Sequence, residues 1–184
     1  MKFGLLRTVP AIERLDLLAE PVARAVAAWP SELPVEEVRV AEIDPNLADT
    51  ANFCETYGIG LAESANCVVV ETRRGQDRQL VACVVLATTR ADVNGLVRRH
   101  VHARRASFAS MNVAVAQSGM EYGGITPVGL PAGWPLLVDA DVAAAPYVVV
   151  GSGLRRSKLL LTGAALAVLP GAEVIPGLGL PAPR

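Results

Sequence analysis

The apolar residues of this chain come in runs of strand length, and this pattern limits the folds that it can adopt. The clearest case is the stretch "NCVVVETRRGQDRQLVACVVLAT". Its two apolar runs, residues 67–71 and 80–87, flank a polar turn that contains Gly75, which is the pattern of a β-hairpin. Gly, Pro and Arg interrupt the other apolar runs, so none approaches the roughly 18 residues of a membrane-spanning helix. We therefore expect a soluble protein with several short, buried strands.

Helices and strands follow one another irregularly in the rest of the chain. Apolar residues at helical spacing predict helices at 11–29 (kinked or split by Pro21), 45–59, 91–102, 110–119 and 162–170. Alternating or continuously apolar residues predict strands at 36–44, 105–110, 135–139, 147–153 and 157–161. Because regular βαβ alternation is missing, we expect a mixed α+β fold, with a barrel-like mixed sheet surrounded by helices, and not a doubly wound sheet.

Charge is distributed unevenly along the chain. The net charge of −1 excludes a general attraction to nucleic acid. Residues 1–65 carry 5 basic and 11 acidic residues, whereas the remainder carries 12 basic and 7 acidic residues. The basic residues of the second part include arginine pairs at 73–74, 98–99, 104–105 and 155–156. Such pairs can bind phosphate groups in bidentate fashion, or they can be solvated charges at turns and helix ends.

Few residues are available for metal or redox chemistry. The chain has an odd number of cysteines, Cys54, Cys67 and Cys83, and no CxxC motif. We therefore expect reduced thiols. His100 and His102 lack an acidic or cysteine partner at metal-binding spacing, and we expect neither a metal nor a cofactor. Charged residues interrupt the first sixteen residues, "MKFGLLRTVPAIERLD", which argues against a secretory signal and for a cytoplasmic location.

The stretch "EYGGITPVGLP" is the first candidate for a functional loop. Gly123 and Gly124 lack a Cβ atom, so a ligand can approach the backbone closely and positive φ values cost little. Pro127 has a restricted φ and favours an extended Thr126. The amides of Gly124, Ile125 and Thr126 can then converge on one oxygen, as in an oxyanion hole. The alternative is a purely structural turn between a helix and a strand.

A second glycine loop follows an apolar strand in "VVVGSGLRRSKLLL". Gly151, Ser152 and Gly153 form this loop, and Arg155 lies two residues further on. The loop is not a dinucleotide-binding fingerprint, because position 156 is an arginine where the third glycine of GxGxxG belongs. It also lacks the GK[ST] of a phosphate-binding P-loop.

In their order and spacing, these segments resemble the YbaK/ProX family of aminoacyl-tRNA editing domains, which also occur inserted in prolyl-tRNA synthetases. The resemblance covers about residues 36–175 and includes "VEEVRVAE", "LADTANFCETYGI" and "NCVVVE". It implies a mixed α/β barrel-like domain whose single pocket hydrolyses the ester between a wrong amino acid and the tRNA 3′ end. Residues 1–35 would then be a helical extension, and residues 176–184 a loosely ordered tail.

The resemblance also implies which residues form the site. In the family, a glycine-x-x-x-proline loop lines the pocket and holds the aminoacyl ester; Gly123 and Pro127 match that spacing. A family lysine that contacts the substrate is replaced here by Asn66, and we expect no other lysine to substitute for it, because Lys158 lies on a different strand. The predicted catalytic residues are Asn66, Gly123, Gly124, Ile125, Thr126 and Pro127. The predicted substrate-binding residues are Cys67, Gly129, Gly151, Ser152, Gly153 and Arg155.

Two functions stay open at this point. The first is a deacylase for mischarged aminoacyl-tRNA, acting on the acceptor end without a membrane or DNA partner. Its water would be oriented by Thr126, Asn66 or Ser152; covalent catalysis by Cys67, Ser107 or Ser152 is the less economical route. The second is an inactive editing-like domain that binds the tRNA 3′ end, a nucleotide or a protein. The helix at 11–29 either forms a homodimer surface or packs on its own domain.

Overall fold

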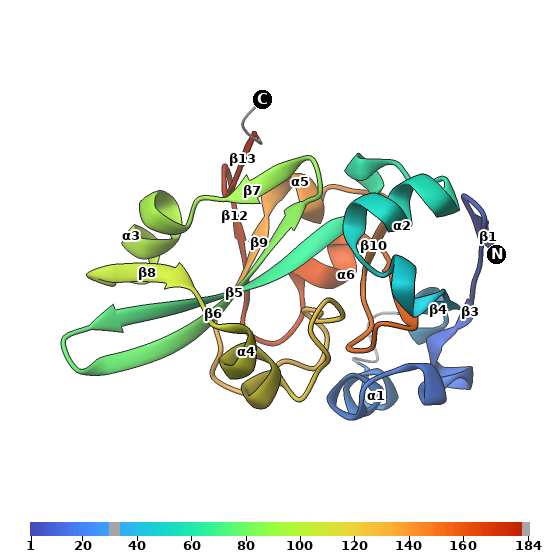
Figure 1. The fold of residues 1–184 in the computed structure, drawn as a ribbon, viewed down its shortest axis with the longest axis horizontal. Coiled ribbons are helices and arrows are strands. Elements are labelled where there is room, and N and C mark those ends of the chain that lie inside the picture. The colour runs from blue at the N-terminus through green and yellow to red at the C-terminus, as the bar shows by residue number, and fades with distance from the viewer. Residues whose placement is uncertain (30–33, 182–184) are drawn as a thin grey trace.

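The protein is described here by a computed structural model that covers residues 1–29 and 34–181. Two β-sheets form its centre (Figure 1). The four-stranded sheet has the order β10-β11-β4-β3 and the five-stranded sheet the order β12-β9-β6-β5-β8. Two further two-stranded pairs are β1-β2 and β13-β7. The strands are β1 (Lys2–Phe3), β2 (Leu6–Arg7), β3 (Val9–Pro10), β4 (Arg39–Glu42), β5 (Ala65–Arg74), β6 (Asp77–Leu86), β7 (Thr89–Ala91), β8 (Arg105–Phe108), β9 (Leu136–Asp139), β10 (Val148–Gly151), β11 (Ser157–Leu161), β12 (Ala172–Ile175) and β13 (Gly179–Pro181).

Short helices surround these sheets (Figure 1). The α-helices are α1 (Glu20–Ala27), α2 (Thr50–Tyr57), α3 (Arg98–His100), α4 (Met111–Ser118), α5 (Ala140–Ala143) and α6 (Gly163–Ala167). The other helical turns are η1 (Ala11–Glu13), η2 (Leu15–Leu17), η3 (Val35–Glu37), η4 (Pro45–Leu47), η5 (Leu61–Glu63) and the π-helix η6 (Val93–Val97). None of the helices in the described ranges is long and apolar enough to cross a membrane.

The larger sheet confirms the predicted hairpin and the mixed topology. β5 and β6 pair antiparallel from Ala65 opposite Leu86 to Arg74 opposite Asp77, and β9 adds to β6 in parallel. The smaller sheet is antiparallel throughout. A single bridge between Ser64 and Val149 links the two sheets, and no closed barrel forms among the described strands. The fold is therefore a mixed α+β fold with two sheets instead of one closed barrel.

The main core lies between the two sheets and continues under the N-terminal segment. Val84 and Val138 reach into it from the larger sheet, and Val150 and Leu159 from the smaller one. These strands are continuously apolar because both faces are covered: the opposite face of the larger sheet packs against η6, where Val97 is fully buried. Apolar burial of this kind is the main stabilising contribution to such a fold.

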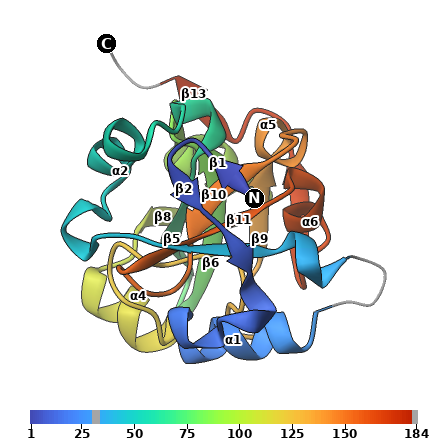
Figure 2. The same ribbon diagram turned by 90° about the vertical axis from the view of Figure 1, so that its right-hand side faces the viewer.

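The segment 11–29 is split more finely than a kinked helix. It forms η1, η2 and then α1, in which Pro21 occupies the first turn, where its missing N–H leaves no hydrogen bond unmade. Val22 and Val26 of α1 are buried in the main core. The helix itself lies at the bottom of the view in Figure 2. The apolar face of α1 is therefore covered by its own chain and is not a free dimer surface. The expected break "PSELP" lies mostly in residues 30–33, outside the described ranges.

Four helix boundaries lie close to the predicted ones, and capping residues define each of them. Gly58 and Gly119 end α2 and α4 in the left-handed conformation, with φ of 64° and 69°. The hydroxyls of Ser110 and Thr162 accept backbone N–H groups at the starts of α4 and α6. The helix expected at 91–102 is shorter: it begins after Asp92, whose carboxylate accepts from the amides of η6.

The expectation of a loosely ordered tail from residue 176 is wrong for residues up to 181. β13 pairs antiparallel with β7, and Leu178 is fully buried under the larger sheet. The amide of Gly179 donates to Asp139 Oδ2 at 2.8 Å. A buried leucine and a strand pairing hold the segment, and neither is visible in its glycine- and proline-rich composition. Residues 182–184 lie outside the described part.

Candidate functional site

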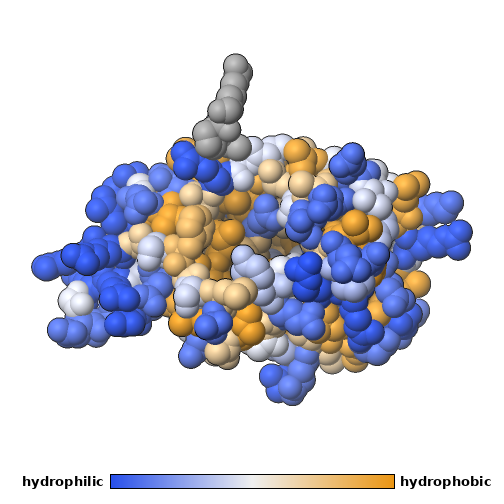
Figure 3. Space-filling model, viewed as in Figure 1, coloured by the Kyte–Doolittle hydropathy of each residue, from blue (hydrophilic) through white to orange (hydrophobic). Residues whose placement is uncertain are grey.

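A cavity of about 470 Å³ opens between the two sheets, beside the glycine loop. Its walls come from segment 48–50, residues 64–69 at the start of β5, the first turn of α4, the loop 122–125 and the end of β10. Apolar residues gather in the middle of this face of the molecule (Figure 3). A pocket of this size suits a small ligand or the end of a larger one.

Six of the twelve predicted site residues line this cavity. They come from three separate parts of the chain, which supports the idea of one site. The six are Asn66, Cys67, Gly123, Ile125, Gly151 and Arg155.

Asn66 sits at the start of β5, where it is held by α2. The hydroxyl of Thr50, the first residue of α2, donates to Asn66 Oδ1 at 2.7 Å. The Asn66 Nδ2 group donates to no residue in the described ranges. The side chain is thus oriented by its oxygen, and its two N–H donors remain for a ligand in the cavity.

Arg155 closes one side of the cavity mouth. Its guanidinium donates to the carbonyl oxygens of Pro45 at 3.0 Å and Tyr122 at 3.4 Å, so it bridges η4 and the glycine loop. Its own backbone amide donates to Glu121 Oε2 at 2.6 Å. Gly123, with φ of 81°, leaves the space in which this guanidinium lies.

The two glycine loops pack directly against each other. The amide of Gly153 donates to Gly124 O at 2.7 Å, and that of Glu121 donates to Gly153 O at 2.8 Å. A Cβ atom at Gly124 would lie 2.7 Å from the Leu154 carbonyl carbon, and one at Gly151 would overlap the Gly124 carbonyl. Close backbone approach therefore explains both glycines, and an open nest for a ligand is not needed to account for them.

The loop amides are used differently from the expected convergence on one oxygen. Gly124 N–H donates to Glu121 O at 2.9 Å within the loop, and Thr126 N–H faces Met120 Sδ at 3.5 Å. Among the three, only the Ile125 amide donates to no other described residue. One amide rather than three is thus available from this loop to a bound carbonyl.

The other six predicted residues lie behind the cavity wall: Gly124, Thr126, Pro127, Gly129, Ser152 and Gly153. Thr126 and Pro127 are buried, and the Thr126 hydroxyl has no partner among the described residues. Gly129, with φ of 79°, packs against the backbone of Pro21. Ser152 is fully buried; its hydroxyl is 2.7 Å from Ser157 Oγ. These residues support the cavity wall from behind and do not line the cavity itself.

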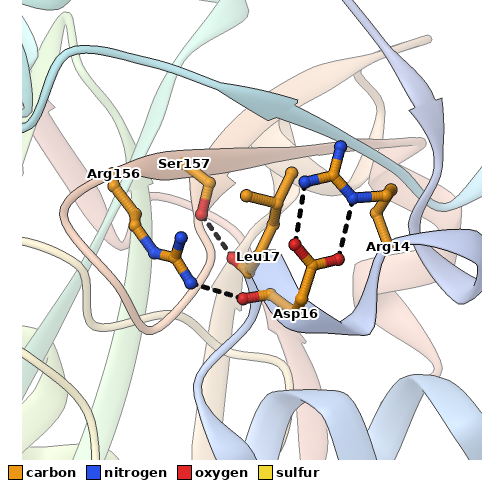
Figure 4. A network of polar contacts seen from close by, with 5 residues as sticks. All are labelled: Arg14, Asp16, Leu17, Arg156 and Ser157. Atoms are coloured by element: carbon orange, nitrogen blue, oxygen red, sulfur yellow. Dashed lines mark hydrogen bonds and ion pairs between the residues drawn. The ribbon is translucent and has the colours of Figure 1, made fainter.

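The turn between β10 and β11 is tied to the N-terminal segment (Figure 4). Ser157 Oγ donates to Leu17 O, and Arg156 donates to Asp16 O, both at 2.5 Å. Arg14 pairs in bidentate fashion with the Asp16 carboxylate at 2.8 Å. The segment before α1 therefore helps to hold the second glycine loop in place.

Sequence reasoning missed several residues that line the cavity, such as Phe108 and Tyr122. Another of them is Lys158. It lies opposite Gly151 in the β10-β11 pairing, so the antiparallel turn brings it to the same pocket as Asn66. Its side chain is buried, and Nζ donates to Ala48 O at 2.9 Å and lies 5.1 Å from the centre of the Phe53 ring. Lys158 does lie on a different strand, as expected, but this position does not keep it out of the cavity. A charged residue within the apolar run "SKLLL" was the available signal.

Burial affects the titration of two groups in the cavity. It lowers the pKa of Lys158 to about 8, with a smaller lowering by Arg155 that is opposed by Cys54 and Asp49. Burial also raises the pKa of the Cys67 thiol far above its usual range. Cys67 is therefore a protonated thiol at neutral pH and a poor nucleophile.

The two histidines lie outside the cavity. His100 Nε2 is 2.9 Å from Glu173 Oε2, and His102 sits in the turn after α3 with φ of 52°. Ser107 is exposed on β8, and neither histidine joins it or Ser152 in a hydrogen bond. Within the described ranges no three His, Cys, Asp or Glu side chains are grouped as a metal site would require.

The fold, with its cavity beside the glycine loop, is that of YbaK-like editing domains. A candidate trans-editing enzyme for prolyl tRNA synthetase superposes with a TM-score of 0.69 at 22% identity, over 85% of this chain and 96% of that one. The hypothetical protein APE2540 superposes with a TM-score of 0.74 at 22% identity, over 88% of this chain and 100% of that one.

The sequence comparisons show that the similarity to editing domains includes the family as well as the fold. This chain belongs to the aminoacyl-tRNA editing domain family, whose model matches residues 44–169, more than half of the chain. The uncharacterized protein YwhH of Bacillus subtilis (strain 168) is 26% identical over 123 residues, which are 67% of this chain and 75% of that protein. The resemblance seen in the two glycine loops is confirmed.

Proposed function

We propose that this chain is an aminoacyl-tRNA deacylase, a carboxylic ester hydrolase that removes a wrong amino acid from the 3′ end of a tRNA. The observation that carries the proposal is the cavity in which Asn66, the glycine loop and the end of β10 meet, in a member of the editing-domain family. Its volume of about 470 Å³ can take an amino acid together with part of the terminal ribose.

The polar groups of the cavity suit hydrolysis without a covalent intermediate. The N–H groups of Asn66 and of the Ile125 backbone can donate to the ester carbonyl and to the negative charge that develops on its oxygen. Water adds to the carbonyl carbon, and the bond from that carbon to the ribose oxygen breaks. The ribose oxygen takes up a proton from the water, and the amino acid leaves as its carboxylic acid. The neighbouring ribose hydroxyl is positioned to activate that water.

The exposed aromatic residues at the rim of the cavity suit the last bases of the acceptor end. Phe108 and Tyr122 both line the cavity and are 63% and 60% exposed. Bases stack on exposed aromatic rings regardless of their sequence. A single-stranded 3′ end could thus be held outside the pocket while its ester enters it.

A row of arginines supplies a surface for the phosphate backbone. In the strand register, Arg73 lies opposite Arg78 on one side and Arg105 on the other, so the three side chains share one face of the sheet. Val69, in the cavity wall, lies on the same face of β5, about 13 Å along the strand. Glu71 pairs with Arg73 at 2.6 Å and offsets part of this charge. The hairpin carrying the row projects from the body as a hydrophilic arm (Figures 1 and 3).

A panel of mischarged tRNAs tests this function. The purified protein is incubated with Ala-, Cys-, Ser- and Thr-tRNA esters, and the remaining ester is followed over time. We expect accelerated loss of at least one ester, and a strong reduction of that rate in Asn66→Ala. If a folded protein hydrolyses none of the panel, the enzymatic proposal is wrong.

The replacement of the family lysine by Asn66 motivates a second candidate, an inactive editing-like domain that binds the tRNA 3′ end, a nucleotide or a protein. Asn66→Lys separates the two. If the native protein is inert and this variant gains deacylase activity, the second function holds. If the native protein already hydrolyses an ester, it does not.

A further inference from the structure

Burying the ammonium group of Lys158 costs free energy, and no acidic side chain within the described residues pairs with it to offset this cost. The residue is only 9% exposed. Its Nζ makes one hydrogen bond, to Ala48 O, and no carboxylate of the described ranges lies within salt-bridge distance. An ammonium has three donors, so two remain for other partners. A buried cation without an anionic partner is rare in proteins and is usually retained for a function.

This cation lines the same cavity as Asn66, the position at which the family resemblance implies a lysine. Lys158 is anchored to Ala48, and Asn66 is anchored to Thr50, two residues further along the same wall. Both side chains line the same cavity, although they come from strands of different sheets. A ligand that would meet a lysine at position 66 therefore enters a cavity that contains the ammonium of Lys158.

We propose that Lys158 is the substrate-binding cation of this pocket, and that its ammonium donates to electron-rich oxygen atoms at the tRNA 3′ end in place of the lysine that Asn66 replaces. This inference rests on the proposed function for the identity of the ligand. The shared chemistry is an oxygen that carries full or partial negative charge. Its two sources are the ester carbonyl and the terminal phosphate, and each has its own probe below.

Three titratable side chains around the ammonium, together with its burial, determine its response to pH. Asp49 and Cys54 face it from the start and the middle of α2, and Arg155 faces it from the turn after β10. Burial dominates over all three and holds the pKa of Lys158 at about 8. Burial also raises the pKa of the Cys54 thiol. Loss of the Lys158 proton is therefore expected to weaken ligand binding above pH 8.

Direct binding tests the inference independently of hydrolysis. Two probes are titrated into the full-length protein by calorimetry: adenosine 5′-monophosphate, which has the phosphate, and 3′-alanylamido-3′-deoxyadenosine, which has the carbonyl but cannot be hydrolysed. For the probe whose oxygen meets Lys158, we expect the affinity to be about tenfold or more weaker in Lys158→Met, in line with the loss of a charge-assisted hydrogen bond. Native binding of that probe should also weaken by at least about fivefold between pH 7 and pH 9.5.

Matched variants separate a binding role from a structural one. Lys2→Met removes the other lysine of the chain and should leave both affinities unchanged. Lys158→Arg keeps the charge and should keep part of the affinity. The exchange Asn66→Lys with Lys158→Met returns the cation to β5 and should recover binding that Lys158→Met loses. Thermal unfolding of each variant shows whether it is folded.

The outcomes distinguish this inference from the proposed function. If a folded Lys158→Met binds both probes as the native protein does, or if the native protein binds neither, the inference is wrong. Lysine-dependent binding by a protein that hydrolyses no ester supports the inference and contradicts the deacylase proposal. Hydrolysis that survives unchanged in Lys158→Met, with unchanged binding, contradicts the inference alone.

Discussion

Asn66 and Lys158 illustrate how much depends on single residues in this pocket. Asn66 offers two neutral donors that are oriented through the hydroxyl of Thr50. Lys158 offers a charge that is held at Ala48 and kept in an apolar environment beside Phe53. A charge-assisted hydrogen bond is about twice as strong as a neutral one, so the two residues are expected to contribute unequally to substrate binding.

The free energy of unfolding should report the burial of Lys158. Below pH 8 the lysine is protonated in both states, and the folded state carries the cost of burying the charge. Between about pH 8 and pH 10.5 the folded state releases the proton while the unfolded state keeps it, so the stability rises with pH. The expected gain is at most about 3 kcal/mol.

Urea denaturation of the native protein and of Lys158→Met across pH 7 to 10.5 measures this gain. The difference between the two proteins cancels the contributions of the other titrating groups. We expect the advantage of Lys158→Met to shrink steadily above pH 8. A difference that does not vary with pH would mean that the burial of the ammonium does not control its pKa.

Removal of the Asn66 side chain should reduce activity more than stability. In Asn66→Ala the cavity loses two donors, and the Thr50 hydroxyl loses its acceptor at the rim. We expect kcat/KM for the edited ester to fall roughly tenfold, the effect of about one hydrogen bond in the transition state. Thr50→Val serves as the control: it leaves the Asn66 donors in place but unoriented, and a smaller loss of kcat/KM is expected. An equal loss of kcat/KM in both variants would mean that the orientation of the Asn66 side chain, and not the number of its donors, limits the rate.

At the level of elements, the two glycine loops act as one unit. The loop before β9 and the turn between β10 and β11 exchange backbone hydrogen bonds at 2.7 and 2.8 Å. The turn is anchored in addition to the segment before α1 by Ser157 and Arg156. The position of Ile125 in the cavity wall therefore depends on three segments that are distant in the sequence.

A methyl group between the loops should disturb this unit. In Gly124→Ala the new Cβ would lie 2.7 Å from the Leu154 backbone, so the loops must separate. We expect a loss of about 1–3 kcal/mol in the free energy of unfolding, as for overpacked cores, together with reduced deacylation. Gly75→Asn is the matched control, because Gly75 has open space around it and asparagine tolerates its positive φ. Unchanged melting of Gly124→Ala would show that the loops can part freely.

For the whole molecule, charge is organised by the sheet rather than by the sequence. The arginines at 73–74 and 104–105 are thirty residues apart in the chain, but the pairing of β5 with β8 sets Arg73 beside Arg105. The fourth pair behaves differently, since Arg155 lies at the cavity mouth and Arg156 holds the N-terminal segment. A chain with almost no net charge thus presents one strongly basic arm.

The binding of tRNA should depend on this arm and on salt. Replacing Arg73, Arg78 and Arg105 together by alanine removes up to three phosphate contacts. We expect weaker binding and a slope of log K against log salt that is smaller by about 2 to 3. Fluorescence anisotropy with labelled tRNA at 50 to 200 mM salt measures both. Arg24→Ala, on the exposed face of α1, is the control for an arginine outside the arm. A triple variant with the native slope would place the tRNA on another face.

The sequence alone was sufficient for those features that depend on neighbouring residues. Glycines and hydroxyl side chains at helix ends, such as Gly119 and Thr162, act within one turn, so their positions predict the boundaries directly. The β5-β6 hairpin needs only two apolar runs and a short turn. The order and spacing of two glycine loops predict the family whose model matches residues 44–169.

Tertiary structure decided everything that depends on strands meeting across the fold. Lys158 reaches the pocket only because β11 folds back on β10, and Leu178 orders the tail only because the larger sheet covers it. Half of the predicted site residues lie behind the wall rather than in it, since facing depends on twist and packing that one sequence does not display. Local order is encoded by contacts a few residues apart, whereas the location of a buried charge is determined by long-range pairing.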